Sequence, residues 1–523
     1  MRPALAAVAL LAFAPALALD ERQAGRERMR ADIEFLCSPP LEGRASLTQG
    51  ADAAAWFLAT EMRKAGLRAP DGTSYLQRFE LVPIRLDRER SSIRVRNNGI
   101  ERTFTPEAVF FPKPERRVDL ALDVVFAGFG ITAPEFGYDD YAGVDVRGKA
   151  VLVFDHEPQE NDPRSAFHGT GFTLHAHTWT KTWNAQQHGA AAVILVTEPV
   201  NTHRSAPRAP DRASAPPQAL EESELRIPRF WATQDAAVAL LAGTGHTPAD
   251  WQADIDRTLR PSSRPLTGVR VELAAANTET AARASWNVAG LLPGADSRLR
   301  NETILVTAHY DHLGVQNGKL YPGANDNASG IAALLEVARV ITGERLPRSV
   351  LFVSFGSEEQ LMLGSYYYVA HPLRPLETTR AVLNLDMIGR DEAHTPESAG
   401  AYEVTAGRSD QLNLVGASFS PDLAATLERE ARRTGVTLSD KFDRDSSMRA
   451  LFRCDHLPFL QKGIPAVWLF GGFHPGYHEP SDTIDQLDFD KMERTVRLAA
   501  AEVRALAHTA EPPRFRYGAT PTR

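Results

Sequence analysis

Acidic and imidazole side chains follow several apolar runs in the C-terminal half of the chain, at positions where they could bind metal ions. The run TILVTAHYDH ends in His309 and Asp311, and VLFVSFGSEE ends in Glu358 and Glu359. Four further candidates are Asp326 in YPGANDNASG, Asp386 in AVLNLDMIG, and His474 and His478 after IPAVWLF. Imidazoles and carboxylates without a thiolate form a donor set that suits zinc and also fits cobalt or manganese. We therefore expect a metal centre built from these residues.

The sequence around these candidates alternates strand-like and helix-like segments from about Ala284 to Leu506. Apolar runs typical of buried strands are WNVAGLL, TILVTAH, SVLFVSF, AVLNLDM and IPAVWLF, whereas SGIAALLEVARVI has helical periodicity. This alternation predicts an α/β fold, with a mixed, mostly parallel sheet flanked by helices. Ligands from distant parts of the chain can then meet in the crevice beyond the carboxyl ends of the strands.

The adjacent carboxylates Glu358 and Glu359 are predicted to do different jobs. Two dications held about 3.5–4 Å apart repel each other, so they need a shared carboxylate and a bridging hydroxide. Neighbouring residues at the start of a helix point about 100° apart. One glutamate can therefore bind a metal while the other acts as the general base for a metal-activated water that attacks a carbonyl group.

Six motifs, in this order along the chain, resemble those of the two-zinc exopeptidases. They are AHYDHLG, GANDNASG, FGSEEQLMLGS, LNLDMIGR, CDHLPFLQKGIPAVWLF and YHEPSDT. This family includes bacterial secreted leucine aminopeptidases, glutamate carboxypeptidase and the non-catalytic transferrin receptor. The resemblance implies the zinc exopeptidase fold and two Zn²⁺ ions per chain. It implies that Asp326 bridges the ions, that His309 and Asp386 complete one site, and that Glu359 and His478 complete the other.

The same resemblance assigns three residues that act beside the metals. It implies that Glu358 is the general base and that Tyr477 hydrogen-bonds the oxyanion. Asp311 is expected to orient His309 from behind, as carboxylates beside metal-bound histidines commonly do. The stretch LEGR resembles the start of many bacterial members, which implies that Arg44 lies near the active site. His312 and His474 remain open between a role beside the substrate and a structural one.

The resemblance also divides the chain into parts. VFAGFGITAPEFGYDDYAGVDVRGKAVLV followed by HGAAAVILV resembles a protease-associated domain. The expected division is a signal peptide at 1–18, the N-terminal part of the peptidase domain at 19–118, an inserted β-rich protease-associated domain at 119–275, the zinc peptidase core at 276–508 and a loose tail at 509–523. Within the insertion, SAPRAPDRASAPPQALEES is expected to be a loop and HAH a surface segment.

The N-terminus and the composition indicate where the protein acts. Arg2, an apolar stretch and a small-residue site ending at Ala18 are typical of a secretory signal peptide, so we expect a secreted or periplasmic protein without a stable membrane anchor. A net charge of −8 without a basic block argues against a nucleic-acid partner. The two cysteines are Cys37 and Cys454, and the family usually has Ser at the second position. Whether they pair, and the oligomeric state, stay open.

The most favoured function is a secreted zinc metallopeptidase that releases N-terminal residues from peptides. A carboxypeptidase or dipeptidase on the same metals is the first alternative, and Arg390, Arg444 and Arg453 are candidates to grip a substrate carboxylate. A glutaminyl cyclase is less favoured because relatives of that kind work with one zinc ion. A non-catalytic binding protein is also less favoured because Glu358 and all five ligands are present.

Overall fold

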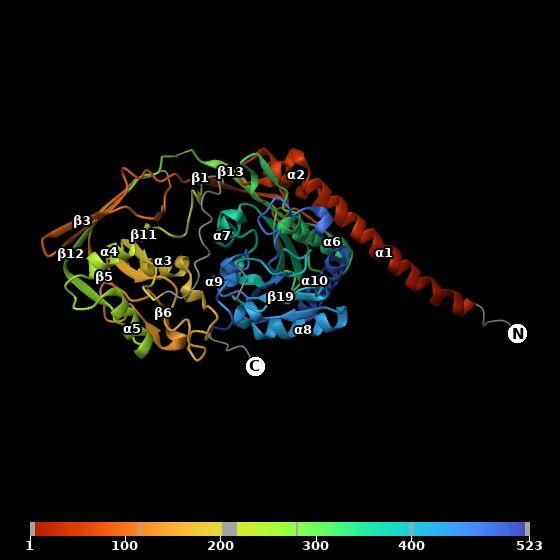
Figure 1. Cartoon of the computed structure of the whole chain (residues 1–523). Helices are drawn as coiled ribbons and strands as arrows, with labels where there is room; N and C mark the ends of the chain where they lie inside the picture. The colour runs from red at the N-terminus through yellow and green to blue at the C-terminus, as the bar shows by residue number, and fades with distance from the viewer. Residues whose placement is uncertain are drawn as a thin grey trace.

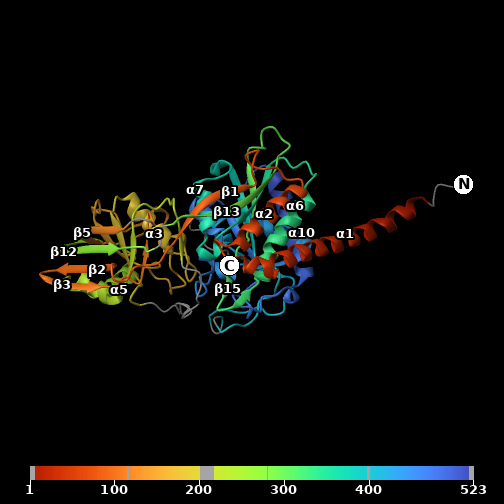
Figure 2. The same ribbon diagram turned by 90° about the horizontal axis from the view of Figure 1, so that it is seen from above.

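The computed structural model describes residues 6–114, 117–200, 217–278, 281–396, 398 and 401–517, with side chains from residue 21 onwards. Two lobes lie side by side, and a long N-terminal helix extends from one of them (Figures 1 and 2). The expected signal peptide, residues 1–18, lies outside the residues described with side chains. Most of the expected Pro-rich loop also falls outside, although its end forms a short strand at Gln218–Leu220.

One lobe is built on a nine-stranded sheet. In spatial order its strands are β10 (Gln218–Leu220), β1 (Leu76–Pro83), β13 (Arg283–Leu292), β17 (Ser349–Phe355), β14 (Thr303–His309), β18 (Thr379–Asp386), β21 (Ala466–Phe470), β19 (Gln411–Val415) and β20 (Thr437–Ser439). The four central strands β17, β14, β18 and β21 are mutually parallel. At one margin, β10, β1 and β13 each run antiparallel to the next strand of the sheet. The predicted mixed sheet is therefore confirmed, with its parallel part at the centre.

Helices cover both faces of this sheet, as predicted. The helices of this lobe are α1 (Ala6–Leu36), α2 (Gln49–Lys64), α6 (Gly330–Ile341), α7 (Leu363–Ala370), α8 (Pro421–Thr434), α9 (Leu457–Gln461) and α10 (Phe489–His508). One apolar core joins α1, α2, α6 and α10 to one face, and a second joins α7 and α9 to the other. Central strands such as β14 are buried along their whole length, which explains their continuous apolar sequence.

The other lobe contains an eight-stranded sheet. Its strands are, in order, β3 (Ile100–Phe104), β2 (Ser92–Asn97), β12 (Arg264–Ala275), β5 (Val118–Phe126), β8 (Ala150–Phe154), β9 (Ala192–Val196), β11 (Arg229–Ala232) and β4 (Ala108–Phe110). Helices α3 (Thr178–Gln187), α4 (Gln234–Leu241) and α5 (Pro248–Thr258) accompany it, with a small ribbon of β6 (Thr132–Ala133) and β7 (Tyr138–Asp139). A second small ribbon, β15 (Gly314–Gln316) with β16 (Lys319–Tyr321), belongs to the first lobe and contacts residues 39–44. The expected boundary at residue 119 divides the eight-stranded sheet, because β2, β3 and β4 lie before it. Strand β10, from within the expected insertion, instead pairs with β1.

The C-terminal segment is not loose over its described part, contrary to expectation. The ring of Phe515 stacks on Phe419 of the first lobe, and Tyr517 stacks on His175 of the second. Arg516 donates its backbone N–H to the carbonyl of Phe419 at 2.8 Å. The aromatic side chains therefore fix residues 515–517 across the junction of the lobes.

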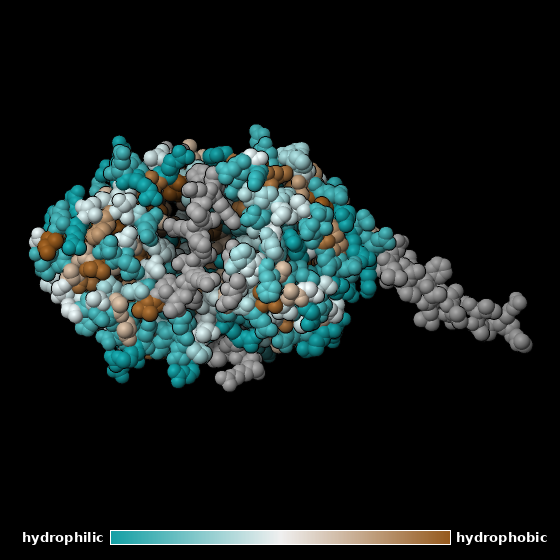
Figure 3. Space-filling model, in the orientation of Figure 1, coloured by the Kyte–Doolittle hydropathy of each residue, from teal (hydrophilic) through white to brown (hydrophobic). Residues whose placement is uncertain are grey.

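The surface shows no continuous apolar face in the view of Figure 3, where hydrophobic residues form small separate patches among hydrophilic ones. None of the helices searched, which cover the described residues, is long and apolar enough to cross a membrane. Both cysteines are free thiols in the structure, with Cys454 buried.

Candidate metal centre

The ends of the central strands bring the candidate ligands together. Strands β14 and β18 are parallel neighbours and end at His309 and Asp386. Strand β17, on the other side of β14, leads within three residues into the short turn that carries Glu358 and Glu359. Because these three strands run in the same direction, their carboxyl ends meet at one edge of the sheet.

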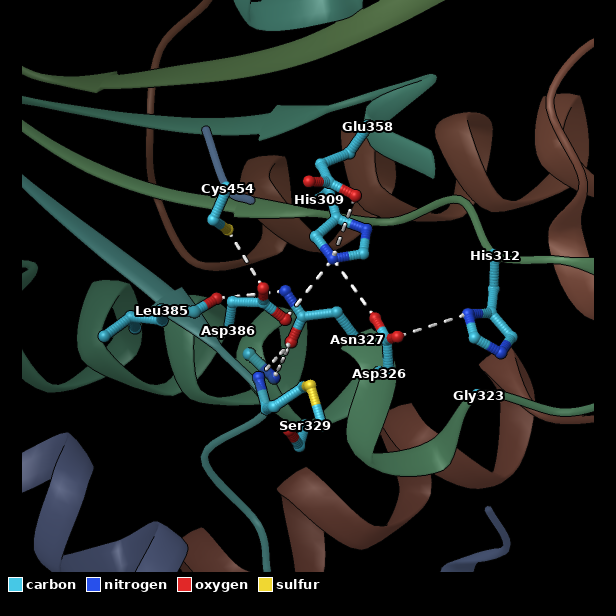
Figure 4. A network of polar contacts seen from close by, with 12 residues as sticks. His309, His312, Gly323, Asp326, Asn327, Ser329, Glu358, Leu385, Asp386 and Cys454 are labelled. Carbon is cyan, nitrogen blue, oxygen red and sulfur yellow. Dashed lines mark hydrogen bonds and ion pairs between the residues drawn. The ribbon is translucent and has the colours of Figure 1, made fainter. Parts of the chain in front are cut away.

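His309, Asp326 and Asp386 form the first group of ligand atoms. His309 Nε2 lies 3.3 Å from Asp326 Oδ1 and 3.3 Å from Asp386 Oδ1. Figure 4 shows the imidazole pointing between these two carboxylates, with Glu358 on its other side. The three residues are all buried.

The second group lies on the opposite side of Asp326. His478 Nε2 is 3.1 Å from Asp326 Oδ2 and 3.2 Å from Glu359 Oε2. His312 Nδ1 also reaches Glu359 Oε1 at 2.7 Å. Each oxygen of Asp326 thus faces a different imidazole, His309 or His478, which is the arrangement that a bridging carboxylate requires.

The donor set fits zinc. Imidazole nitrogens and carboxylate oxygens are both zinc ligands, and the two groups together hold three carboxylates in a buried space. Within the described residues, Asp386 Oδ1 is buried and makes no hydrogen bond. Buried polar atoms are normally satisfied, so an unsatisfied ligand atom that points into a cluster favours a bound cation.

Glu358 and Glu359 have opposite electrostatic environments. Burial, together with the charges of Asp455, Glu359 and Asp386, raises the pKa of Glu358 well above its usual value despite the opposing effect of His309. Burial also acts on Glu359, but His478 and His312 outweigh it and lower its pKa to about 2. A carboxylate with a raised pKa suits proton transfer, and one that stays ionised suits ligation.

The two histidines respond to the same carboxylates. Burial lowers the pKa of His309, but Glu358 and Asp386 reverse this and hold the pKa well above its usual value. Burial likewise opposes the charged form of His478, yet Glu359 and Asp326 raise its pKa to about 10. Both imidazoles therefore lie in a strongly negative environment, which also attracts a metal cation.

Asp311 and Arg44 position the chain around the ligands. The carboxylate of Asp311 accepts the backbone N–H groups of Glu358, at 2.9 Å, and Glu359, at 3.3 Å. The backbone carbonyl oxygen of Asp311 lies 3.2 Å from His309 Nδ1, whereas its carboxylate oxygen Oδ1 lies 3.9 Å from the same nitrogen. Arg44 is fully buried and donates to four backbone carbonyls beside the site, so it lies near the metal centre but does not enter it.

Two residues support Asp326 that the sequence analysis did not assign. The carboxylate of Asp482 accepts the backbone N–H groups of Asn325 and Asp326 at 3.0 Å each. His474 Nε2 lies 2.8 Å from Asn325 Nδ2, and burial lowers the pKa of His474 to about 3. The signal for Asp482 was present in YHEPSDT, since an acidic residue follows His478 closely.

Cys454 contacts a ligand directly. Its thiol donates to Asp386 Oδ2 at 2.9 Å (Figure 4). Asn384 Nδ2 donates to Cys454 Sγ at 2.9 Å. Tyr477 stacks its ring on His478 and packs edge-on against Phe473. Burial raises the pKa of the Tyr477 hydroxyl, so this group stays protonated and can donate a hydrogen bond.

The arginines and the HAH segment were further candidates from the sequence, and Arg390 lies beside Gly476 and His474 in the loop that carries His478. Arg444 pairs with Asp440 at 2.6 Å, and the guanidinium of Arg453 lies over the ring of Phe473. The HAH segment is not on the surface, contrary to expectation, because His175 is buried and its Nε2 lies 2.7 Å from Glu135 Oε1.

Comparisons with known proteins show which families and chains this sequence is similar to. Residues 287–503 match the model of peptidase family M28, and residues 120–240 match the PA domain. Aminopeptidase YwaD of Bacillus subtilis is 31% identical over 210 residues, which are 39% of this chain and 40% of that protein. Leucine aminopeptidase 2 of Trichophyton rubrum is 28% identical over 227 residues, which are 39% of this chain and 41% of that protein.

The chain spans about 40% of the length of these curated relatives. Among solved structures, a zinc aminopeptidase from Bacillus subtilis aligns with 94% of this chain and 98% of its own, at 20% identity and a TM-score of 0.45.

Proposed function

We propose that the protein is a zinc aminopeptidase that removes N-terminal residues from peptides, on the premise that residues 287–503 match the model of peptidase family M28. The observation that carries the proposal is the position of Asp326, whose two oxygens lie 3.3 Å from His309 Nε2 and 3.1 Å from His478 Nε2. One carboxylate between two imidazoles, with one further acidic ligand on each side, is the set needed for two neighbouring zinc ions.

Five residues would hold the metals. His309 and Asp386 would bind one zinc ion, Glu359 and His478 the other, and Asp326 both. Zinc at such a site supplies Lewis-acid chemistry, because it polarises a peptide carbonyl and lowers the pKa of water.

Glu358 moves the proton in this proposal. Its Oε2 lies 3.9 Å from His309 Nε2, so its carboxylate faces the same space as the ligands. It would accept the proton of the attacking water and pass it to the amine that leaves. Its backbone N–H is fixed by Asp311, which keeps the carboxylate aimed into the site.

The relatives, rather than the arginines, favour an aminopeptidase over a carboxypeptidase. Arg444 is paired with Asp440 and Arg453 lies over an aromatic ring, whereas Arg390 lies beside Gly476 and His474 and is the arginine to test for a grip on a substrate carboxylate. The most similar relatives described above are named aminopeptidases. A carboxypeptidase would need a cation that grips the terminal carboxylate of its substrate.

Two adjacent substitutions test the assignment. Glu358→Gln should lower peptidase turnover by about 10²–10⁴-fold while the zinc content stays that of the wild type. The matched variant Glu359→Gln should instead lose zinc, because it removes a ligand. Zinc content by mass spectrometry and turnover on one peptide would be measured together, and wild-type turnover in Glu358→Gln would exclude Glu358 as the base.

Peptide substrates distinguish the direction of cleavage. The zinc-loaded protein would be incubated with matched peptides that carry free or acetylated N-termini, including one with N-terminal Gln. Stepwise loss of N-terminal residues from the free-amine set alone is expected. Loss from the C-terminus of both sets would favour a carboxypeptidase, and loss of ammonia from the Gln peptide would favour a cyclase.

We further propose that residues 1–18 direct the protein to the periplasm or the medium and are then removed. The support is the charged start, the apolar run and the small residues around Ala18. N-terminal sequencing of protein recovered from outside the cytoplasm should begin near Leu19, whereas intact Met1 on that protein would contradict removal.

A further inference from the structure

A second cluster of candidate ligands lies in the inserted lobe, away from the centre described above. Strands β8 and β9 are parallel neighbours, and Phe154 pairs with Val196 at their carboxyl ends. Asp155 and His156 follow β8 directly, and Glu198 follows β9 after one intervening residue. The carboxyl ends of these strands therefore place three potential ligands at one edge of the sheet, as in the other lobe.

The distances in this cluster are those of a compact site. His156 Nδ1 lies 2.8 Å from Glu198 Oε1, and His156 Nε2 lies 3.6 Å from Asp155 Oδ2. One ligand atom from each of the three residues lies within 4.8 Å of the other two, as in the His309 group. Glu160 adds a further carboxylate, with Oε2 at 3.2 Å from His156 Nδ1.

Two oxygen atoms in the cluster are left without hydrogen bonds. Asp155 Oδ1 and Glu198 Oε2 are buried and have no partner in the described part of the chain, and these residues are only 2% and 1% exposed. An ionised carboxylate that is removed from water normally has its oxygen atoms paired or bound to a metal. These two atoms therefore provide evidence for a ligand that does not depend on the spacing of the cluster.

The charge balance also calls for a cation. Asp155, Glu160 and Glu198 bring three carboxylates into a buried space, and the buried ammonium of Lys181 is already hydrogen-bonded to the carbonyl of Phe129. Asp140 and Glu157 are also buried and act on Lys181, so buried carboxylates outnumber the cations around the cluster. Without an ion, a protonated His156 would have to hold the cluster, and the surrounding carboxylates do raise its pKa to about 10 against the effect of burial.

We propose that Asp155, His156 and Glu198 bind one divalent metal ion of the zinc class, with Glu160 as the nearest additional oxygen donor. Two kinds of donor, imidazole and carboxylate, are present, and no thiolate is. With Glu160 the site would have four protein donors, the number typical of a structural zinc site, so we assign it a structural role.

The ion would stabilise the contact between the two lobes. The ring of Phe172 lies 5.1 Å from the ring of His156 and stacks at 5.2 Å on Phe452 of the peptidase lobe. In the same segment, Thr170 Oγ1 donates to the carbonyl of Arg444 at 2.8 Å. Metal binding fixes His156 and, through Phe172, the segment that rests on the peptidase lobe.

The experiment counts zinc ions in the full chain with the first centre disabled. The double variant His309→Ala/His478→Ala, loaded with zinc and dialysed, should keep one equivalent per chain by mass spectrometry. Adding Asp155→Asn, or independently Glu198→Gln, should remove that equivalent. Adding Glu502→Gln, which changes a buried carboxylate of the peptidase lobe outside both clusters, should leave it in place.

Two results would overturn the proposal. The first is that the His309→Ala/His478→Ala variant keeps its circular dichroism spectrum but holds no zinc. The second is that one zinc ion per chain remains when both Asp155 and Glu198 are substituted as well. Single variants of the wild-type protein provide a second measurement. Asp155→Asn alone should lower the zinc content by one ion per chain, whereas Glu358→Gln should not change it. Failure of the aminopeptidase proposal would leave these counts unaffected.

Discussion

Replacing Arg44 by Met should destabilise the peptidase lobe by several kcal/mol. The side chain of Arg44 is fully buried and donates to the carbonyls of Tyr310 at 2.8 Å, Pro322 at 2.8 Å, Gly323 at 3.0 Å and Leu36. These carbonyls belong to three segments: the end of α1, the turn after His309 and the loop before Asp326. One guanidinium therefore holds both metal-ligand loops to the first helix.

The magnitude follows from what the substitution leaves behind. Each hydrogen bond from a charged donor contributes about 1.5–3 kcal/mol. Gly323 keeps a second donor, the N–H of Ala328 at 3.2 Å, so the carbonyls of Tyr310, Pro322 and Leu36 suffer most. Removing the buried charge offsets part of this loss, because its desolvation costs several kcal/mol. A net destabilisation of ~3–5 kcal/mol results, the range found when one part of a buried charged network is removed.

The assay is urea unfolding of the zinc-loaded full chain. Two lobes can unfold in separate transitions, so each transition is fitted on its own. Arg44→Met should shift the transition of the peptidase lobe, and Arg44→Lys should shift it less, since an ammonium cannot reach four carbonyls at once. Arg298→Met, whose side chain is 88% exposed in the wild type, serves as the control and should stay within about 0.5 kcal/mol. A loss of less than ~1 kcal/mol in Arg44→Met would refute the reasoning.

Three further changes test other parts of the molecule. The buried carboxyl of Glu502 has its pKa raised from 4.5 to about 8 by burial and by Glu430, so the folded state binds its proton more tightly and stability falls as pH rises from about 4.5 to 8. Glu502→Gln should remove this pH dependence. Its free energy of unfolding should equal that of the wild type near pH 4.5 and exceed it at pH 8 by at most ~5 kcal/mol, at about 1.4 kcal/mol per pH unit. The same difference between variant and wild type at both pH values would contradict this. Cys454→Ala removes the donor to Asp386 and should weaken zinc binding about 10–100-fold in a chelator competition, whereas Cys454→Ser should retain it; equal affinity in the two variants would show that the contact is unimportant. Leu361 has a φ of 69° and is 79% exposed, so Leu361→Gly should gain up to about 1 kcal/mol in urea unfolding, while Leu361→Ala, which keeps the strained backbone, should not.

The peptidase lobe was predictable because its signals are local. Continuous apolar runs mark β14, β17 and β18, and the acidic residues and His309 stand at or just past their ends, so parallel neighbours bring them together. The second sheet was harder to delimit. Strands β2 and β3 alternate or are largely exposed, and nothing local shows that β2 pairs with β12, more than 160 residues away, rather than with the first sheet.

The roles of supporting residues were also beyond the sequence. Asp311 was expected to orient His309, and its carboxylate lies 3.9 Å from His309 Nδ1, but the sequence did not show that it also binds the backbone of Glu358 and Glu359. Which atom of a residue faces a ligand depends on the path of the backbone, which residue spacing does not determine. The C-terminal aromatics looked loose for a similar reason, since their partners Phe419 and His175 lie far away in the chain.

The pairing of β1 with β13 has a consequence for how such a protein arose and how it can be redesigned. Leu76 pairs with Val288 and Leu81 with Arg283, so the chain leaves the peptidase lobe and finally returns to it at neighbouring points of one ladder, with only β10 added to the same sheet in between. Some two hundred residues thus occupy the place of a hairpin turn. Because the antiparallel ladder sets the register by itself, a gene segment of almost any length could be accepted there without disturbing the catalytic strands. The same junction offers a place to graft a foreign domain or to replace residues 84–281 with a short turn.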